Sequence, residues 1–251
     1  MSTVFVDAEE PSRREPAPAP AEPPSRYEAL WDEYSRIWDS DPHFRRYRFL
    51  GDEWGPDEWV SGVVENWASP YLRPESCALE IGPGGGRYTI RLAPLCAELA
   101  CVDVSGEMLA RVRRRLAHFG HVRCVKGNGR DLGTIADDRV DFAFSCNVFV
   151  QLGIEDVYGY LVELERVLSP GGVAAIHYAS LSGDEGFRYF LEQRERWAAD
   201  PCQRGRFCEL TLPTMDLLVQ RARLTVVRNE TLGRDAMTVV RKPPDAGRRS
   251  T

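Results

Sequence analysis

Short, nearly continuous apolar runs alternate with helix-spaced apolar stripes through the middle of the chain. This alternation predicts a sheet of mostly parallel strands covered by helices on both faces, an α/β doubly wound fold. We expect strands at 77–82, 98–104, 122–126, 140–147 and 173–179, with intervening helices at 87–95, 106–118 and 155–168. Two later runs, 224–227 and 237–240, predict a closing antiparallel hairpin, which brings the sheet to seven strands.

The segments outside this alternation are expected to form additions to the central domain. Residues 1–24 are rich in Pro and Ala, so we expect disorder there, and residues 243–251 predict a flexible tail. Apolar residues at three-to-four spacing predict a helical cap over 25–70, with a second helix from Pro56 to Trp67. The domain proper is expected at 71–242. It carries an insertion at 181–213 after strand five, with a helix at 185–199, and a further helix follows at 214–222.

The most specific motif lies between the first strand and its helix. It is an acid followed by alternate glycines: Glu80, Gly82, Gly84 and Gly86. Glycines at a strand-to-helix turn let a ligand approach the backbone, because no Cβ stands in the way. A dinucleotide fingerprint requires another glycine where Arg87 stands, which disfavours an NAD-dependent oxidoreductase.

This motif resembles the first motif of the class I S-adenosylmethionine (SAM)-dependent methyltransferases. The resemblance covers about residues 60–180 and includes Asp103 after strand two, the run 140–152 and the helix-turn-strand pattern 161–178. It implies a Rossmann-like fold, SAM as the cofactor and S-adenosylhomocysteine as the product. The function it implies is methyl transfer from SAM.

Residues that leave the strands are the candidates for cofactor binding, because ligands of open parallel sheets bind beyond the carboxyl ends of the strands. A carboxylate at Asp103 can accept both ribose hydroxyls, while Ser105 is available to cap the next helix. By the resemblance, Asn128 and Gly129 occupy the adenine position, and Ser145, Cys146 and Asn147 lie beside the methionine part, near the transferred methyl. The full candidate set is Glu80, Gly82, Gly84, Gly86, Asp103, Asn128, Gly129, Ser145 and Asn147.

Acceptor-side candidates lie later in the chain. His177, at the exit of strand five, is the best-placed general base, and the alternative is a histidine hydrogen-bonded within the wall of the sheet. Many relatives carry His where Gln151 stands, and Gln cannot act as a base. We place Gln151, Tyr178 and Arg206 at the substrate. Arginines such as Arg206 beside aromatic residues suit an anionic acceptor, or they form a solvated helix face.

Aromatic residues of the N-terminal segment leave two interpretations open. Tyr27, Trp31, Tyr34 and Trp54, with His43, either fold over the cofactor as a lid or pack a helix on the domain.

The composition of the chain disfavours several classes of binding partner. A net charge of −6 disfavours nucleic acid, and no apolar run approaches the roughly 18 residues of a membrane span. The N-terminus has no signal-peptide pattern, so we expect a cytoplasmic protein. The seven cysteines include no CxxC pair, so we expect free thiols and no metal. The expected function is methylation of an O or N nucleophile of a small metabolite in bacterial secondary metabolism. A non-catalytic SAM-binding protein is the alternative, and the oligomeric state stays open.

Overall fold

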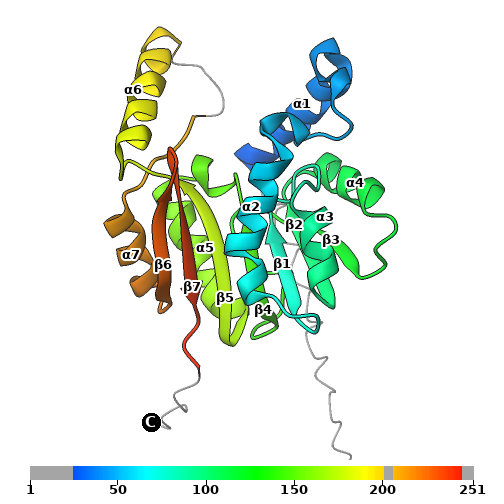
Figure 1. Cartoon of the computed structure of the whole chain (residues 1–251), viewed down its shortest axis with the longest axis vertical. Helices are drawn as coiled ribbons and strands as arrows, with labels where there is room; N and C mark the ends of the chain where they lie inside the picture. The colour runs from blue at the N-terminus through cyan, green and yellow to red at the C-terminus, as the bar shows by residue number, and fades with distance from the viewer. Residues whose placement is uncertain (1–24, 201–205, 245–251) are drawn as a thin grey trace, which may run out of the picture.

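A computed structural model describes residues 25–200 and 206–244 and contains one seven-stranded sheet in the order β3-β2-β1-β4-β5-β7-β6 (Figure 1). The strands are β1 (Cys77–Ile81), β2 (Glu98–Asp103), β3 (Val122–Lys126), β4 (Val140–Ser145), β5 (Leu168–Ala179), β6 (Thr225–Leu232) and β7 (Asp235–Arg241). Strands β1 to β5 are parallel, while β7 runs antiparallel to both β5 and β6. The predicted doubly wound sheet with a C-terminal antiparallel hairpin is therefore confirmed.

Helices cover both faces of the sheet. One face carries α2 (Asp57–Trp67), α3 (Thr89–Leu92) and α4 (Gly106–Arg115), and the other carries α5 (Ile154–Val167) and α7 (Leu212–Arg221). Side chains alternate between the faces along each strand. In β4, for example, Phe142 and Phe144 pack with α2 and α3, whereas Ala143 packs with α5. This two-sided burial explains why the central strands read as continuous apolar runs.

Two strand boundaries differ from the sequence prediction. Strand β4 ends at Ser145 rather than at 147, because Asn147 has φ 63° and leaves the extended conformation. Strand β5 begins at Leu168 rather than at 173, so the Ser-Pro-Gly-Gly segment that predicts a turn belongs to the strand. Gly171 takes φ 82° within it, and its N–H donates to the carbonyl of Lys242 at 3.0 Å.

Helix boundaries differ in the same way. The helix expected at 87–95 is one short α-helical stretch, α3, followed by a 3₁₀ turn that contains Pro94. Pro94 has no N–H to donate, which limits a regular helix at this point. The helix expected at 106–118 ends at Arg115, and Ser105 caps its beginning by accepting from the N–H of Met108 at 3.1 Å.

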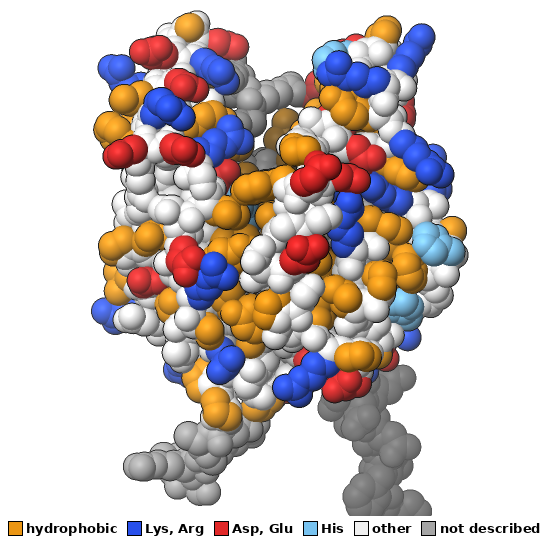
Figure 2. All heavy atoms as spheres, viewed as in Figure 1, with side chains coloured by type: hydrophobic (Ala, Val, Ile, Leu, Met, Phe, Trp, Pro, Cys, Tyr) orange, Lys and Arg blue, Asp and Glu red, His pale blue; other side chains and the backbone are white. Residues whose placement is uncertain are grey.

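Two helices rise above the edge of the sheet where β1 to β5 end. These are α1 (Arg26–Ser40), from the N-terminal segment, and α6 (Asp184–Ala199), from the insertion after β5. They stand apart on opposite sides of the molecule (Figure 1). The space-filling view shows the surface hollowed between these two projections (Figure 2). The predicted N-terminal cap and insertion thus flank one edge of the domain.

Polar contacts bind the cap to the domain. The guanidinium of Arg111 in α4 donates to the Ser35 hydroxyl and carbonyl, each at 2.9 Å, and to Asp39 at 2.7 Å. The hydroxyl of Ser105 donates to Asp32 at 2.5 Å. Arg111 is almost fully buried, so these hydrogen bonds satisfy a charge that water does not reach.

The described part of the chain leaves out residues 1–24, 201–205 and 245–251. The disorder predicted at 1–24 therefore lies outside it, as does the flexible tail predicted at 243–251 from residue 245 onward. None of the helices in the described ranges is both long enough and apolar enough to cross a bilayer.

Replacing Arg111 by Met tests the attachment of the cap. Arg111→Met removes a buried charge-assisted network and leaves Ser35 and Asp39 without their donor, so the free energy of unfolding should fall by about 2–3 kcal/mol. Urea denaturation measures this change. The exposed Arg114 on the same helix provides the control, because Arg114→Met should leave stability nearly unchanged. Equal stability of the two variants would contradict this account.

Candidate functional site

The glycine loop after β1 passes between the sheet and the cap. Gly82 takes φ 69°, and its N–H donates to the carbonyl of Val102 in β2 at 2.8 Å. A Cβ on Gly85 would lie 1.9 Å from the carbonyl oxygen of Leu50, so only glycine fits against the cap at this position. The Arg87 guanidinium donates to the carbonyls of Gly55 and Pro56 and fixes the other end of the loop to the cap.

Asp103 lies at the carboxyl end of β2, beside this loop. Its carboxylate accepts from the N–H of Ser105 at 2.8 Å and from the N–H of Gly84 at 3.3 Å. Burial raises the pKa of Asp103 to about 6, and these two N–H donors oppose the rise. The carboxylate thus takes up protons in a range where a solvent-exposed Asp is ionised.

Glu80, the acid of the motif, is buried behind the loop. Burial raises its pKa to about 8, a hydrogen bond from Thr89 opposes the rise, and the charge of Asp103 adds to it. The thiol of Cys101 approaches one carboxyl oxygen at 4.0 Å. Glu80 is therefore a carboxylic acid that holds its proton near neutral pH.

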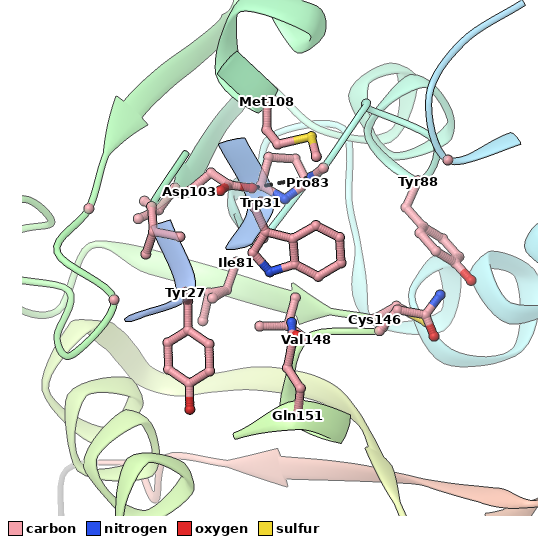
Figure 3. Close-up of a pocket in the computed structure, with 18 of the residues that line it drawn as sticks. Tyr27, Trp31, Ile81, Pro83, Tyr88, Asp103, Met108, Cys146, Val148 and Gln151 are labelled. Atoms are coloured by element: carbon pink, nitrogen blue, oxygen red, sulfur yellow. Dashed lines mark hydrogen bonds between the residues drawn. The ribbon is translucent and has the colours of Figure 1, made fainter. Parts of the chain in front are cut away.

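A cavity of about 860 Å³, counting the part open to solvent, opens at this edge of the sheet. Its wall combines the glycine loop, the ends of β2 and β4 and the N-terminal cap. Figure 3 shows Asp103 and Tyr27 on one side and Tyr88 and Cys146 on the other, with the Trp31 indole between them. The lining residues that the argument uses are Tyr27, Trp31, Trp54, Gly82, Gly84, Tyr88, Asp103, Met108, Gly129, Cys146, Asn147 and Gln151.

Comparisons with known proteins bear on this site. Residues 79–176, which include the glycine loop, Asp103 and the end of β4, match the family model of the methyltransferase domain. Nodulation protein S of Rhizobium tropici is 32% identical over 100 residues, which cover 39% of this chain. The match covers 41% of that protein, so this chain spans less than half the length of that relative.

Solved structures share the fold at low sequence identity. The cyclase SpnF superposes with a TM-score of 0.65 at 14% identity, covering 90% of this chain and 98% of that protein. Magnesium protoporphyrin IX methyltransferase of Synechocystis, solved with S-adenosylhomocysteine bound, gives 0.59 at 15% identity, covering 85% of this chain and 94% of that one.

This chain carries a class I SAM-dependent methyltransferase domain. The predicted family and Rossmann-like fold are therefore confirmed, as is SAM as the cofactor of the domain. The buried Arg87, in place of a third glycine, is consistent with this family and not with a dinucleotide fingerprint.

Six of the residues predicted for the site line the cavity of the methyltransferase domain: Gly82, Gly84, Asp103, Gly129, Asn147 and Gln151. The aromatic residues of the cap lie there too, because Tyr27, Trp31 and Trp54 form part of the wall. Tyr34 braces them, since its hydroxyl accepts from the Trp54 indole N–H at 3.1 Å and donates to Glu53 at 2.7 Å. This arrangement favours the lid interpretation for these residues, while His43 lies outside the cavity wall in an exposed 3₁₀ turn.

Asn128 is not among the residues of the cavity wall, although its neighbours Gly127 and Gly129 are, so its place at the adenine stays a prediction. Its side-chain oxygen accepts from the N–H groups of Arg130 and Asp131, at 2.9 and 3.1 Å. Its amide nitrogen donates to the Asp131 carboxylate at 2.8 Å. Asn128 therefore closes the turn after β3, as Asn commonly does in loops.

Four other predicted residues also lie away from the cavity wall. Glu80 is buried behind the loop, and a Cβ on Gly86 would lie 3.0 Å from Leu116, so Gly86 permits close packing of α4. Ser145 donates to the carbonyl of Ile81 at 3.0 Å within the sheet. Tyr178 packs in the core on the α5 and α7 side, where its hydroxyl donates to Asn229 at 2.8 Å.

Arg206 lines a second hollow in the insertion, where its guanidinium stacks on Trp197 with 4.6 Å from Cζ to the ring centroid. His177 is buried next to the cavity rather than in its wall. Its neighbour Cys146 reaches the wall instead.

Several wall residues were not assigned to the cofactor site by sequence reasoning, among them Tyr88, Met108 and Val148. Each of these three residues follows an assigned motif by no more than one helical turn or one short loop. An apolar residue at such a position is also typical of the core, so its type alone does not indicate a site. Their spacing from Arg87, Ser105 and Asn147 is the signal that could have indicated them.

The buried acid Glu80 makes the stability of the domain pH-dependent. Its folded pKa of about 8 exceeds the unfolded value of 4.5, so the folded state holds a proton that the unfolded state loses between these values. Stability should therefore fall as the pH rises through this window. Thermal unfolding should show Glu80→Gln to be more stable than wild type at pH values above about 8, by about 4–5 kcal/mol, and nearly equal to it at about pH 5. A constant difference across the window would contradict a protonated Glu80.

Proposed function

We propose that this protein transfers the methyl group of SAM to an oxygen or nitrogen nucleophile of a small metabolite, in bacterial secondary metabolism. The observation that carries the proposal is the cavity at the carboxyl ends of β1, β2 and β4, where a glycine loop and the Asp103 carboxylate meet under an aromatic cap.

The residues of this wall fit an adenosyl donor. Asp103 accepts from two main-chain N–H groups, and a carboxylate has further lone pairs that can accept from the two ribose hydroxyls. Gly82 and Gly84 bring backbone rather than side chains to the cavity, which suits the methionine part of the donor. The wall around Met108 and Gly129 offers an apolar slot with close backbone for a flat adenine.

Bound there, SAM supplies a methyl carbon that its sulfonium charge already activates for in-line attack. The protein then has to position the acceptor and keep water out, and positioning alone supplies roughly 7–11 kcal/mol in well-oriented systems. Trp31 and Trp54 contact each other edge to face over the cavity, with ring centroids 5.9 Å apart, and so cover the donor side. Gln151 and Asn147 line the wall and are able to hydrogen-bond an acceptor.

Two features support a small acceptor in a reducing compartment. The net charge of −6 does not favour a polyanion such as nucleic acid, and the cavity of about 860 Å³ has the scale of a metabolite site. All six cysteines in the described ranges are free thiols, as is usual in the cytoplasm.

Replacing Asp103 by Asn tests the donor site. Asp103→Asn should weaken S-adenosylhomocysteine binding about 10- to 100-fold, the equivalent of a charge-assisted hydrogen bond of roughly 1.5–3 kcal/mol. In wild type, binding should tighten about tenfold as the pH rises from about 5 to about 7, because Asp103, with its pKa of about 6, ionises in that window. The variant should lose this pH dependence. Isothermal titration calorimetry measures both effects.

Asn128→Ala is the matched control, because Asn128 lies on a neighbouring loop but outside the cavity wall. Its affinity should stay near that of wild type. Absence of any binding heat in wild type would reject the proposal. Binding without S-adenosylhomocysteine release in the presence of small phenols, amines and carboxylic acids would instead indicate the non-catalytic alternative.

A further inference from the structure

A second hollow of about 520 Å³, counting the part open to solvent, lies in the insertion between α6 and the segment 206–209. One of its sides is a single face of α6, because the lining residues of that helix recur at helical spacing. The lining residues are Phe190, Gln193, Arg194 and Trp197 from α6 and Arg206, Phe207 and Glu209 from the segment that follows. The donor site described above uses none of these side chains.

Backbone contacts fix both sides of this hollow to the sheet. A Cβ on Gly186, in the first turn of α6, would lie 2.1 Å from the carbonyl oxygen of Ser180, so the helix begins in close contact with the chain that leaves β5. On the other side, the N–H of Leu210 donates to the carbonyl of Ala179 at 3.0 Å. The hollow is therefore formed before any ligand binds, as is usual for small-molecule sites.

The second hollow and the main cavity lie on opposite sides of one segment of chain. The N–H of Cys208 donates to the carbonyl of Val150 at 2.8 Å, and its thiol donates to the carbonyl of Gln151 at 3.8 Å. Gln151 lines the main cavity, whereas Phe207 and Glu209, on either side of Cys208, line the second hollow. A ligand in the hollow thus lies close to the cavity in which we propose methyl transfer.

Aromatic rings supply the apolar part of the wall. Phe190, Trp197 and Phe207 all line the hollow, and Trp197 is 37% exposed. The ring of Phe207 is held from behind by Tyr189, with ring centroids 5.6 Å apart, and by the Arg234 guanidinium, with Cζ 5.5 Å from the centroid. Flat aromatic faces bury a planar ring well, so this wall favours a ligand with an aromatic ring.

Positive charge predominates in the hollow. Arg194 and Arg206 bring two guanidiniums and Glu209 brings one carboxyl group. Neither guanidinium forms an ion pair with another described residue. Burial raises the pKa of Glu209, so its carboxyl group is charged less readily than an exposed one. The Arg206 guanidinium stacks on Trp197, which orients the planar group while its N–H edge stays available to a carboxylate.

Gln193 adds an unused donor to the same wall. Its side-chain nitrogen is buried and has no hydrogen-bond partner among the described residues. A buried N–H group without an acceptor costs free energy, which a ligand oxygen at this position would recover. Two guanidiniums and one amide therefore offer donors at a wall that is otherwise aromatic.

We propose that the second hollow binds the distal, non-reacting part of the acceptor, and that this part is an aromatic carboxylate. This inference rests on the proposed function. The aromatic side chains pack against the ring, and the guanidiniums of Arg194 and Arg206 bind the carboxylate. The reacting oxygen or nitrogen belongs to the other end of the same molecule, on the side of Gln151. Contacts to a remote part of a substrate supply binding energy that positions the reacting end.

A matched pair of probes tests the subsite. The probes 4-hydroxybenzoate and 4-hydroxybenzamide have nearly the same shape, but only the first carries a charge. Isothermal titration calorimetry on protein saturated with S-adenosylhomocysteine should show the acid to bind about tenfold more tightly than the amide. Arg206→Met should remove this preference. Arg196→Met is the matched control, because Arg196 is exposed on the same helix outside the hollow, and this variant should keep the preference.

Tryptophan fluorescence locates the bound probe. Trp197 is the tryptophan that lines the hollow, so binding of 4-hydroxybenzoate there should change its emission. The change should saturate together with the calorimetric signal and should be absent in Trp197→Phe. A change that persists in Trp197→Phe would place the probe elsewhere and contradict the proposal.

Steady-state kinetics tests the role of the hollow in methyl transfer. Among acceptors that release S-adenosylhomocysteine, aromatic acids should have the lowest KM. Arg206→Met should raise that KM about tenfold and leave kcat nearly unchanged, because a contact remote from the reacting atom is the same in the ground state and the transition state. The KM of the matching neutral amides should not change in this variant.

The outcomes separate this proposal from the proposed function. Equal binding of acid and amide to wild type, or a preference that persists in Arg206→Met, would overturn the carboxylate subsite. Binding in the hollow with an unchanged KM in Arg206→Met, or turnover confined to acceptors without a carboxylate, would overturn its role in acceptor binding. In each of these cases S-adenosylhomocysteine binding leaves the donor site intact, whereas absence of that binding would overturn the proposed function itself.

Discussion

The glycine loop between β1 and α3 has to touch three surfaces at once, and the rest of the site depends on that constraint. Gly85 meets the Leu50 carbonyl of the cap, Gly82 binds the backbone of β2, and Gly86 lies against Leu116 at the end of α4. A Cβ on Gly85 would lie 1.9 Å from the Leu50 carbonyl oxygen and one on Gly82 would lie 2.2 Å from Val148, so a side chain at either point would displace its neighbour. The loop therefore sets both the place of the cap and the shape of the cavity beneath it.

Two buried acids, Asp103 and Glu80, adjoin this loop, and their carboxyl groups ionise at different pH values. Asp103 faces the cavity with N–H donors on its carboxylate, so a moderate rise in pH ionises it. Glu80 lies behind the loop. In the described part of the chain, none of its hydrogen bonds or ion pairs involves a cation, and burial keeps its carboxyl protonated to higher pH. Because a charge on Asp103 also disfavours a charge on Glu80, the ionised acid is the one that faces a ligand.

Much of the fold follows from the sequence. Parallel strands that are buried on both faces consist of nearly continuous apolar residues, and glycines indicate the turn between β1 and α3. Side-chain direction is harder to predict. His177 and Tyr178 both stand at the end of β5, but successive residues of a strand point to opposite faces, so only one of them turns toward the cavity side. The hydrogen bonds of Asn128 could not be predicted either: a local turn uses its amide oxygen, and a motif comparison does not reveal such a contact. The contact between His177 Nε2 and the Asp235 carboxylate, at 3.5 Å, depends on the pairing of β5 with β7 and has no local signal.

Strand order also separates two groups of residues at the edge of the sheet where the cavity opens. β1 and β2 deliver the glycine loop and Asp103, whereas β4, β5 and β7 deliver Cys146, His177 and Asp235. The boundary between these groups is the β1–β4 junction, where the chain order of the sheet reverses and the strand ends diverge. On the β2 side, main-chain hydrogen bonds fix the positions of Gly82 and Asp103. The insertion after β5 carries aromatic and arginine side chains around a second hollow. Under the proposed function, such an insertion can change acceptor choice while the glycine loop and Asp103 stay the same, because loops on a fixed scaffold vary more readily than its strands.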